Sequence, residues 1–399
     1  MKILTFTSLY PNASRPQHAV FVENRLRRLV ADGRIEARVV APVPWFPLRA
    51  KIFGRYALNA TVPRHERRHG IPILHPRYPT IPKAGMTLAP LLMYAWSKSA
   101  LAGLVNTGYD FDLIDAHYFY PDGVAAALLG RALGKPVTIT ARGTDINVIP
   151  RYAAPRHMIR WAAGQAAGLI AVSRALKESM TALGVEPQRI RVLRNGVDLE
   201  AFRPCERGAL RDKFALPAPV LASVGNLLPN KGHDLVIRAL AELPGVSLVI
   251  VGTGPEERRL RALAGALGLA RRVRFLGSIP HDAMFEIYGV ADVLVLASAR
   301  EGWPNVLLEA MACGTPVAAT RVSGIPEIVA APAAGRLIAA RSPAAIAASV
   351  RALLDDPPAR AETRAYAERF SWDETARGQA ALFDEILGAR QGPGAGQRP

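Results

Sequence analysis

The chain has 399 residues, of which 50% are hydrophobic and 21% are charged, and this composition excludes a disordered or a fibrous protein. Its 50 Lys and Arg residues outnumber its 33 Asp and Glu residues, so the formal net charge is +17 at pH 7. This charge indicates an anionic partner and leaves nucleic acid, an anionic membrane surface and a phosphorylated ligand open. The cysteines Cys205 and Cys313 stand in no Cys/His spacing, so neither a disulfide framework nor a zinc site is expected.

Along the chain, short β-type runs alternate with helical patterns, which is typical of parallel sheets built from βαβ units. One series of strands is predicted at 3–7, 37–41, 113–116, 137–140 and 169–172. A second series is predicted at 220–224, 248–251, 273–276, 293–297 and 317–320. We therefore expect an α/β protein with two doubly wound, Rossmann-like domains that face a central cleft, where ligands bind at the carboxyl ends of the strands.

Glycine and proline residues interrupt the periodicity between the two series, so the domain boundary is predicted there. An N-terminal domain is expected over 1–195, a linker over 196–218 and a C-terminal domain over 219–370. A last helix is expected over 371–390, crossing back to the N-terminal domain, and the tail 391–399 is expected to be disordered. The initial run MKILTFT reads as a strand and not as a signal peptide, so a cytoplasmic location is predicted.

The most informative stretch is 298–327, SAREGWPNVLLEAMACGTPVAATRVSGIPE, which follows a predicted strand. Pro304 suits the first turn of a helix that Gly314 ends. The amides of Asn305 and Val306 at the start of this helix, with the helix dipole behind them, form a site for a phosphate.

Two glutamates of this stretch are candidate sugar-binding groups. Glu301 can accept hydrogen bonds from sugar hydroxyls, and Glu309 can reach a second polyol such as a ribose. The alternative is that both carboxylates are solvated or cap neighbouring backbone. Glu301, followed by Glu309 and by AMACGTPV at 310–317, resembles the E-x(7)-E signature of retaining glycosyltransferases of family 4, which adopt the GT-B fold.

Further motifs resemble that family in the order in which the family shows them, so the resemblance covers essentially the whole chain. They are NGVD at 195–198, VG through KGH at 224–233, VGTGP at 251–255 and VRFLG at 273–277. The resemblance implies an enzyme that moves a sugar from a nucleotide-diphosphate donor to a hydroxyl of a saccharide or lipid-linked acceptor. Helix amides and a lysine then stabilise the diphosphate, so no metal or other cofactor is expected.

The resemblance also implies roles for single residues on the donor side. Lys231 is expected to contact the diphosphate, Glu309 the ribose hydroxyls and Glu301 the donor sugar. The segment after Glu301 is expected to hold the sugar and the phosphate through Gly302, Trp303, Pro304, Asn305 and Val306. The backbone of Phe275, Leu276 and Gly277 is expected to meet the base, and Gly252 and Gly254 to let a loop approach the nucleotide, although such a pair is usually a tight turn.

The N-terminal half is expected to carry the acceptor side, with His117, Asp145 and His18 as candidates at the ends of strands. His117 could equally be a satisfied strand-end histidine. Many members of the family have a His where this chain has Arg142, and the pattern with Arg resembles a subgroup that makes teichuronic acid, exopolysaccharide or lipopolysaccharide chains. Asn226 stands where the family usually has an Arg, so Arg142 or Arg194 is expected to replace that cation.

Segment 45–105 is predicted to face a membrane. Between 45 and 79 it carries seven Lys and Arg residues, including Arg64, Arg67 and Arg68, against the single acid Glu66, and aromatic residues are interleaved with them. Such a segment suits the surface of an anionic leaflet that presents a lipid-linked acceptor. The alternative is a solvated basic loop over an ordinary core helix. No motif for nucleic-acid binding is present.

Other interpretations compete with a metal-independent glycosyltransferase. The pair Asp110 and Asp112 imitates a D-x-D metal motif, but it precedes a strand in the wrong half and lacks further ligands, so we reject it. A nucleotide-sugar epimerase would share the two-sheet plan. An inactive membrane-bound scaffold is the non-enzymatic alternative, which the departures at Arg142 and Asn226 favour.

Overall fold

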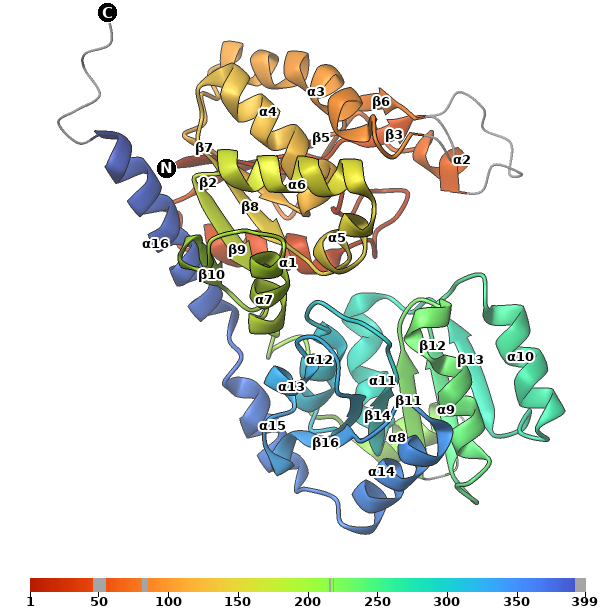
Figure 1. Ribbon diagram of the computed structural model, residues 1–399. Helices are drawn as coiled ribbons and strands as arrows, with labels where there is room; N and C mark the ends of the chain where they lie inside the picture. Colours follow the sequence, from red (N-terminus) through yellow and green to blue (C-terminus); the bar gives the residue numbers. More distant parts are fainter. Residues whose placement is uncertain (46–54, 81–84, 215–216, 218, 392–399) are drawn as a thin grey trace, which may run out of the picture. The chain divides into compact units, whose positions relative to one another are not determined.

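The structure is a computed structural model that describes residues 1–45, 55–80, 85–214, 217 and 219–391. The chain divides into two compact units. The N-terminal unit comprises Met1–Arg194 together with the chain from Asp373 onwards, and the C-terminal unit comprises Asn195–Trp372. Each unit is built on its own sheet, with helices on both faces (Figure 1).

The sheet of the N-terminal unit has the strand order β10-β9-β8-β7-β1-β2-β5-β4. Neighbouring strands are parallel except β4 and β5, which pair antiparallel at one edge. A separate parallel pair is formed by β3 and β6. The strands are β1 (Lys2–Phe6), β2 (Glu36–Val40), β3 (Val43–Trp45), β4 (His65–Arg68), β5 (Ile71–Leu74), β6 (Arg77–Pro79), β7 (Leu113–His117), β8 (Val137–Ala141), β9 (Gly168–Ala171) and β10 (Ile190–Val192).

The helices of the N-terminal unit include one from the far end of the chain. They are α1 (Val20–Val30), α2 (Arg55–Asn59), α3 (Ala89–Asn106), α4 (Val124–Leu133), α5 (Thr144–Asn147), α6 (Ala153–Gln165), α7 (Arg174–Ala182) and α16 (Trp372–Gln391). Leu26 of α1 and Phe383 of α16 share a buried cluster with Ile3 and Leu113 of the sheet. Because burial of such side chains stabilises a domain by a few kcal/mol each, α16 is part of the core of the N-terminal unit.

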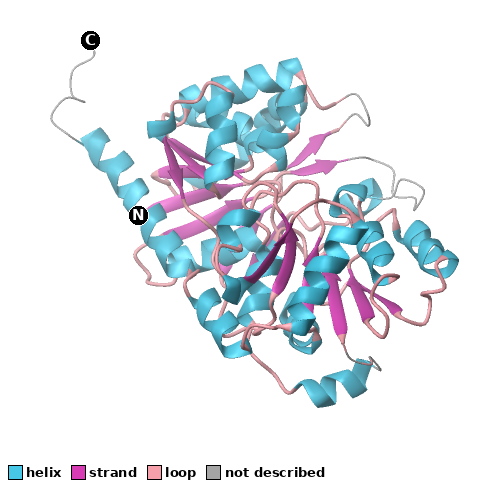
Figure 2. Cartoon of the chain, turned by 60° about the horizontal axis from the view of Figure 1, so that its bottom comes forward, coloured by secondary structure: helices cyan, strands magenta, loops and turns pink. Residues whose placement is uncertain are grey.

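The sheet of the C-terminal unit is parallel throughout, in the order β13-β12-β11-β14-β15-β16. Its central strands are buried along their whole length, as expected for a sheet covered on both faces. Figure 2 shows strands and helices in contrasting colours. The strands are β11 (Val220–Val224), β12 (Ser247–Val251), β13 (Val273–Gly277), β14 (Val293–Leu296), β15 (Val317–Thr320) and β16 (Gly335–Ile338).

One face of this sheet packs on α9, α10 and α14, where Leu240, Leu260 and Val350 join Leu248 and Val295 in a buried cluster. The helices of the C-terminal unit are α8 (Arg207–Phe214), α9 (His233–Leu240), α10 (Glu257–Ala266), α11 (Met284–Val290), α12 (Asn305–Ala312), α13 (Ile325–Ile328), α14 (Pro343–Asp355) and α15 (Arg360–Glu368). Because its strands are parallel, the sheet gathers their carboxyl ends at one edge.

All ten predicted strands are confirmed, each within one residue at either end. The strands that the sequence does not predict are short or polar. β4 reads HERR, and β6 and β10 have three residues each. A run of this length shows no alternation of apolar and polar residues that a pattern could reveal.

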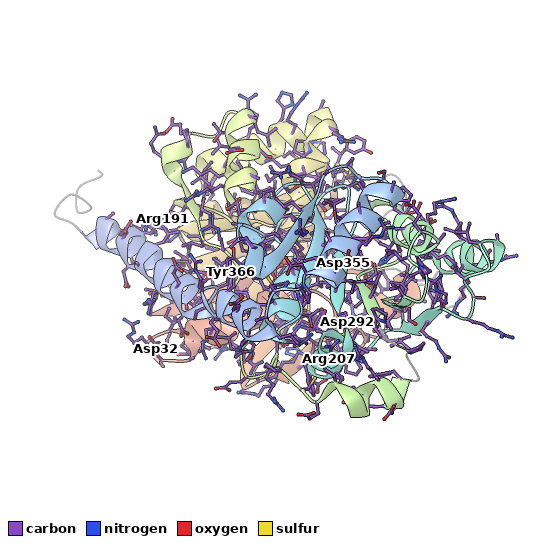
Figure 3. The ribbon with its side chains drawn as sticks, turned by 90° about the horizontal axis from the view of Figure 1, so that it is seen from below. Asp32, Arg191, Arg207, Asp292, Asp355 and Tyr366 are labelled. Atoms are coloured by element: carbon purple, nitrogen blue, oxygen red, sulfur yellow. The ribbon has the colours of Figure 1, made fainter. Side chains whose placement is uncertain are left out.

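The predicted linker differs from the structure. Segment 196–218 contains α8, and Arg207 of α8 forms an ion pair with Asp292 (Figure 3). Arg211 of the same helix also pairs with Asp292. The described part of this segment therefore packs as part of the C-terminal unit. Gln391 ends α16, and the remainder of the predicted tail, 392–399, lies outside the described residues. Among the described residues, no helix combines the length and hydropathy that a membrane span requires.

Candidate functional site

In the C-terminal unit, the loops that follow β11 and β12 are packed backbone against backbone. The Gly225 amide donates to Val251 O at 2.9 Å, and the Gly252 amide donates to Gly277 O at 2.7 Å. A Cβ atom on Gly252 would lie 2.0 Å from Gly225 O, and one on Gly254 would lie 2.4 Å from Leu227 O. The glycines at 252 and 254 are therefore required by contact between loops, which is the tight-turn alternative; their approach to a nucleotide stays a prediction.

Lys231 and Glu301 meet at this edge of the sheet, although 70 residues separate them. Lys231 Nζ lies 2.5 Å from Glu301 Oε1, and the Ser298 hydroxyl donates to the same oxygen at 2.7 Å. Gly232, with φ +72, allows the approach, because a Cβ atom there would lie 2.3 Å from Ala297 O. The side chains of Lys231 and Glu301 are 22% and 12% exposed. The structure therefore gathers a cation and a carboxylate in one partly accessible position.

Helix α12 begins at Asn305, so Pro304 is its N-cap residue and lies one position outside the first turn. The Asn305 side-chain oxygen accepts a hydrogen bond from the Asn195 amide at 3.2 Å. Gly314, with φ +78, follows the end of the helix as predicted. The N-terminal amides of α12 keep the orientation that binds anions, because the first turn of any helix leaves them without partners inside the helix.

Glu309 is buried on α12, with 8% of its surface exposed. Tyr288 donates its hydroxyl hydrogen to Glu309 Oε2 at 2.7 Å, and His281 Nε2 lies 3.2 Å from Oε1. Burial lowers the pKa of His281, but the hydrogen bond and charge of Glu309 outweigh it, so the net shift is upward. Neither partner is predicted from the sequence, because neither Tyr288 nor His281 belongs to a motif that marks the site.

The side chain of Trp303 does not point to a ligand. It is 7% exposed, its Nε1 donates to Asn195 O at 3.0 Å, and its ring centroid lies 6.2 Å from that of Phe370. The expectation that Trp303 binds the donor is therefore wrong for its side chain, which packs inside the C-terminal unit. A role for its backbone, and for that of Gly302 and Val306, stays a prediction.

Segment Phe275–Gly277 lies beside the loop after β12. Gly277, with φ +68, presents its carbonyl to the Gly252 amide, and the Arg261 guanidinium lies 4.4 Å from the centroid of the Phe275 ring. The expected base-binding backbone, Leu276 included, thus borders the same edge as Lys231. Asn226 lies in the neighbouring loop, where its carbonyl accepts from the Leu228 amide at 2.8 Å.

In the N-terminal unit, His117 is the last residue of β7 and Arg142 follows the neighbouring strand β8, and the two side chains are joined directly. Arg142 donates to His117 Nδ1 at 2.7 Å, and His117 Nε2 lies 3.1 Å from Asp115 Oδ2. Burial is the main reason that the pKa of His117 is lowered to about 4. The charge of Arg142 lowers this pKa further, whereas Asp115 raises it by less than burial lowers it. His117 is therefore neutral at pH 7, and its Nε2 carries the proton that Asp115 accepts, because Nδ1 must accept from Arg142.

This chain of contacts continues to α16. Gln379 Nε2 donates to Asp115 Oδ2 at 2.8 Å, and Gln379 Oε1 accepts from Arg25 Nε at 2.6 Å. Thr138 donates to the other oxygen of Asp115 at 2.8 Å. Each of these side chains is buried. Buried hydrogen bonds that join side chains in this way hold them in one geometry, so Gln379 and Arg25 support the position of Arg142.

Asp145 has a different role from the one expected. Its carboxylate is buried and accepts hydrogen bonds from the backbone amides of Phe119 at 2.7 Å, Gly143 at 2.7 Å and Arg142 at 3.1 Å. Burial raises its pKa despite these bonds. The expectation that Asp145 meets an acceptor is wrong, because its oxygens tie together the loops after β7 and β8.

The roles expected for His18 and Arg194 in the N-terminal unit stay predictions. His18 precedes α1 and is partly exposed; burial, assisted by Arg15, lowers its pKa to about 4. Arg194 ends the N-terminal unit, where its carbonyl accepts from the Thr375 hydroxyl. The predicted site residues thus divide between the two units, with His18, His117, Arg142, Asp145 and Arg194 in the N-terminal unit.

The basic segment is only partly free for a membrane. Arg68 binds Glu23 through two hydrogen bonds, at 2.6 and 3.2 Å, and Arg67 donates to Gly70 O at 2.6 Å. Arg64 is exposed. The predicted residues within 46–54 and 81–84 lie outside the described residues. Four large apolar side chains at and before α3 are 40% to 48% exposed, namely Met86, Leu88, Leu91 and Trp96.

The rejected metal motif separates into two unrelated contacts. Asp110 pairs with Lys135 at 2.6 Å, and Asp112 accepts from the Lys2 amide at 2.7 Å. Among the described residues, no group of three or more His, Cys, Asp and Glu side chains is arranged to hold a metal ion.

Known proteins resemble this chain in sequence and in fold. Residues 18–201 match the family description "Glycosyltransferase Family 4", and residues 208–370 match "Glycosyl transferases group 1". The chain is 30% identical over 333 residues to the glycosyltransferase TuaC of Bacillus subtilis, a protein named for teichuronic acid biosynthesis, with 82% of each chain covered. It is 40% identical over 228 residues to the D-inositol 3-phosphate glycosyltransferase of Acidothermus cellulolyticus, of which it spans half, with 52% of this chain covered.

Solved structures extend the likeness to the complete fold. The sucrose-phosphate synthase of Thermosynechococcus elongatus superposes with a TM-score of 0.79 at 20% identity, covering 97% of this chain and 99% of that one. The HepE protein of Anabaena, solved with UDP and glucose, gives 0.73 at 23% identity, covering 96% and 100%. The two sheets with their strand-end loops define an α/β protein of the GT-B class. The chain belongs to family 4 of the glycosyltransferases and is a transferase enzyme.

Proposed function

We propose that this enzyme transfers a sugar from a nucleotide-diphosphate donor to a saccharide or lipid-linked acceptor, with retention of anomeric configuration, in the synthesis of a cell-surface polysaccharide. The observation that carries the proposal is the pairing of Lys231 with Glu301 beside the start of α12. A lysine ammonium offsets the charge that develops on a departing diphosphate, and oriented helix amides add to this effect without a metal.

The contacts of Glu309 support the recognition of a ribose. Its two oxygens accept from Tyr288 and lie near His281, yet a carboxylate has about four lone-pair positions, so each oxygen can still accept from a hydroxyl. Tyr288 and His281 hold the carboxylate in one orientation, so the Glu309 side chain loses less conformational entropy when a ligand binds. The similar HepE protein was solved with UDP and glucose, which is consistent with such a donor.

On this proposal, Arg142 meets the donor sugar or a phosphate from the N-terminal unit. Its guanidinium is held by His117, and a fixed guanidinium can bind phosphate or carboxylate with paired hydrogen bonds. In the reaction, the acceptor oxygen forms a bond to the anomeric carbon on the face from which the phosphate oxygen leaves. The acceptor proton passes to that leaving phosphate, so no enzymic nucleophile is needed.

The acceptor is proposed to reach the enzyme at the cytoplasmic face of a membrane. The exposed apolar side chains Leu88, Leu91 and Trp96 suit the interface of a bilayer, and Arg64 and Lys98 are exposed cations of the same unit. The name of TuaC refers to teichuronic acid biosynthesis, and the name of the inositol phosphate enzymes refers to D-inositol 3-phosphate. Both names are consistent with a saccharide or lipid-linked acceptor.

The test is a thermal-shift screen of the full chain against UDP-, GDP- and ADP-sugars, followed by mass spectrometry of the best donor with lipid extract. We expect one class of donor to raise the melting temperature, and nucleotide release to depend on the acceptor. Lys231→Ala and Glu309→Ala should abolish the shift, while Arg377→Ala, at an exposed position of α16, should leave it unchanged. Nucleotide release or donor isomerisation without acceptor would favour an epimerase, and no shift with any donor would favour an inactive scaffold.

A further inference from the structure

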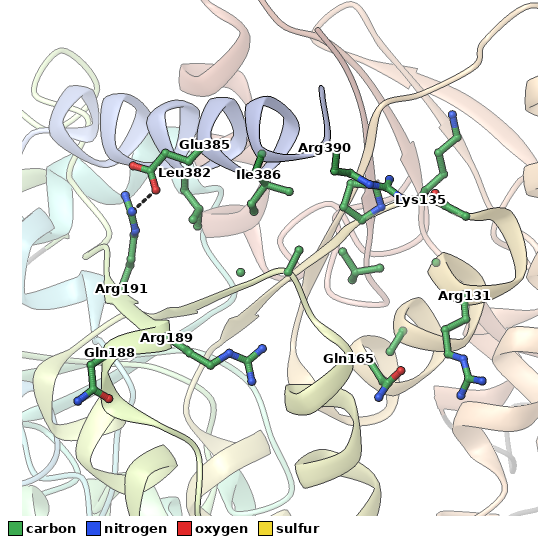
Figure 4. Close-up of a pocket in the computed structure, with 18 residues that line it drawn as sticks. Arg131, Lys135, Gln165, Gln188, Arg189, Arg191, Leu382, Glu385, Ile386 and Arg390 are labelled. Atoms are coloured by element: carbon green, nitrogen blue, oxygen red, sulfur yellow. Dashed lines mark hydrogen bonds and ion pairs between the residues drawn. The ribbon is translucent and has the colours of Figure 1, made fainter. Parts of the chain in front are cut away.

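A basic pocket of about 720 Å³ lies in the N-terminal unit, at the edge of the sheet opposite to His117 and Arg142. Val137, the first residue of β8, and Gly168, the first residue of β9, line it. The C-terminal half of α16 forms one wall, as Figure 4 shows. The pocket is therefore separate from the strand ends at which the transfer reaction is proposed.

The described lining holds five basic side chains and one acidic side chain. Arg191 pairs with that acid, Glu385, and Lys135 pairs with Asp110, which lies outside the lining. The three other cations, Arg131, Arg189 and Arg390, have no acidic partner within the described part of the chain. The pocket therefore keeps an excess of positive charge after its internal ion pairs are formed.

The negative ends of two helix dipoles offset part of this excess of positive charge. Arg189 donates to Ala166 O at 2.7 Å and Arg390 donates to Gly134 O at 3.0 Å, so these two cations cap the C-terminal ends of α6 and α4. A helix end carries only about half a negative charge. Each guanidinium has five N–H groups, and each spends one here, so several donors of Arg189 and Arg390 are left for a ligand.

Three polar side chains of the lining have no hydrogen-bond or ion-pair partner among the described residues. They are Arg131, Gln165 and Gln188. Figure 4 shows these three side chains, together with Arg189, on the side of the pocket away from α16. Guanidinium groups bind phosphate with paired, charge-assisted hydrogen bonds, and the two amides can bond to polar groups of the same ligand.

Part of the pocket lining is apolar. Val137 of β8 and Leu382 and Ile386 of α16 belong to this lining. Gly130 lets Val137 pack closely against α4, because a Cβ atom on Gly130 would lie 2.3 Å from the Val137 side chain. A Cβ atom on Gly168 would lie 3.0 Å from Ile386. A lining with both cationic and apolar side chains, in a volume usual for small-molecule sites, suits a ligand with a charged end and an uncharged body.

We propose that this pocket binds a phosphorylated small molecule, with its phosphate groups held by Arg131, Arg189 and Arg390 and its uncharged body over Val137, Leu382 and Ile386. This site goes beyond the proposed function, because it uses neither the donor residues nor Arg142. It also gives a role to arginines that the transfer reaction leaves unexplained. The phosphate can belong to a free metabolite or to the headgroup of a lipid.

The experiment uses inorganic triphosphate as the probe and isothermal titration calorimetry as the readout. It is done on the full chain carrying Lys231→Ala and Glu309→Ala, so that the donor site does not contribute. We expect one triphosphate per chain, and at least tenfold weaker binding after Arg131→Gln and Arg189→Gln are added. Arg377→Gln, at an exposed position of the same helix α16 outside the pocket, is the matched control and should bind as the parent does.

Far-ultraviolet circular dichroism and melting temperature verify that each variant is folded. A second arm measures sedimentation with vesicles of phosphatidylcholine containing phosphatidic acid. If the pocket variant loses triphosphate and vesicles together, the phosphate is that of a lipid headgroup; if it loses triphosphate alone, the ligand is a free phosphate compound. Equal triphosphate binding by the pocket variant, the Arg377→Gln control and the parent, or no binding to the parent, would overturn the proposal.

Discussion

Arg142 donates a hydrogen bond of 2.7 Å to Nδ1 of His117, a neighbour from the adjacent strand. This contact sets the tautomer of the imidazole, because Nδ1 must then be the acceptor and Nε2 must carry the hydrogen that faces Asp115. A residue that the sequence places at the donor sugar is therefore in direct contact with a neutral histidine. The protonation state of His117 is the first property to test.

The neutral state of His117 predicts a loss of stability in acid. Its pKa is lowered to about 4 by burial, whereas the unfolded value is about 6.5. Because the unfolded chain binds the proton more strongly, the stabilisation is full above about pH 6.5 and is lost as the pH falls through 4, by roughly 3 kcal/mol for this group. Urea unfolding between pH 7.5 and 4 measures how steeply the free energy of unfolding depends on pH.

The control for this prediction is His117→Asn, whose side-chain carbonyl can still accept from Arg142. This variant should take up about one proton fewer on unfolding between pH 6.5 and 4 than the parent does. Burial also lowers the pKa values of His18 and His233 to about 4, so part of the slope remains in the variant. An unchanged proton uptake would show that His117 is charged in the folded protein.

Gln379→Leu tests whether α16 supports Arg142. The substitution removes the donor to Asp115 and the acceptor for Arg25, and a broken buried hydrogen bond costs about 1–3 kcal/mol. We expect a lower melting temperature and a fall of about tenfold in kcat, with a smaller change in the KM of the donor. Arg377→Leu, on the exposed side of α16, should change neither. A kcat equal to that of the parent, measured well below the melting temperature, would remove Gln379 from the positioning network.

Lys231→Met tests the ion pair with Glu301. Loss of the ammonium should lower kcat by about 10²–10³-fold, the usual effect of removing one electrostatic stabiliser of a transition state. Lys231→Arg keeps the charge but not the compact shape and should recover part of the rate. Initial rates of nucleotide release with acceptor present give the measurement. Activity within threefold of the parent in Lys231→Met would exclude the diphosphate role.

The pair of His281 with Glu309 predicts the opposite pH dependence from that of His117. Burial lowers the pKa of His281, but Glu309 raises it by more, so the folded value lies above the unfolded one of about 6.5. The stabilisation is therefore full below pH 6.5 and is lost as the pH rises through the folded pKa. Melting temperatures are compared between the parent and His281→Gln from pH 6 to 8.5, because His117, His18 and His233 contribute alike to both. The margin by which the parent melts above the variant should shrink as the pH rises. A variant with the parent's pH dependence would contradict the assignment.

The exposed apolar residues of α3 predict membrane association. Leu91→Ser with Trp96→Ser removes two side chains that are 46% and 48% exposed, so their loss should cost little stability. The fraction that sediments with vesicles containing phosphatidylglycerol should fall several-fold. Leu267→Ser, a comparable exposed leucine of the C-terminal unit, is the control. If both variants sediment like the parent, α3 is not the docking surface.

Local information in the sequence accounts for the fold to a large extent. Alternation of apolar strands and amphipathic helices predicts ten strands within one residue, because period and burial are encoded within a few neighbouring positions. The spacing of Glu301 and Glu309 likewise depends on one loop and one helix. Short or polar strands such as β4 escape prediction, because their pairing with β5 and not their own composition makes them strands.

Contacts between distant residues were decided by the tertiary structure. Lys231 and Glu301 are 70 residues apart, and Asp115 and Gln379 are 264 apart. Sequence motifs name the first pair but cannot say that the two side chains neutralise each other, and no motif points to Gln379. Such contacts follow from the order of strands in a sheet and from the helix that covers it, which no spacing along the chain encodes.

The same difference between local sequence information and tertiary contacts explains why the expectations for Trp303 and Asp145 were wrong. From the sequence alone, the stretch after Glu301 is recognisable, but the direction of the Trp303 side chain and the use of the Asp145 carboxylate are not. The Trp303 side chain is buried, and its indole donates a hydrogen bond to the carbonyl of Asn195. The Asp145 carboxylate accepts hydrogen bonds from three backbone amides. A buried polar group must find a partner, and only the packed fold decides whether that partner is the protein or a ligand.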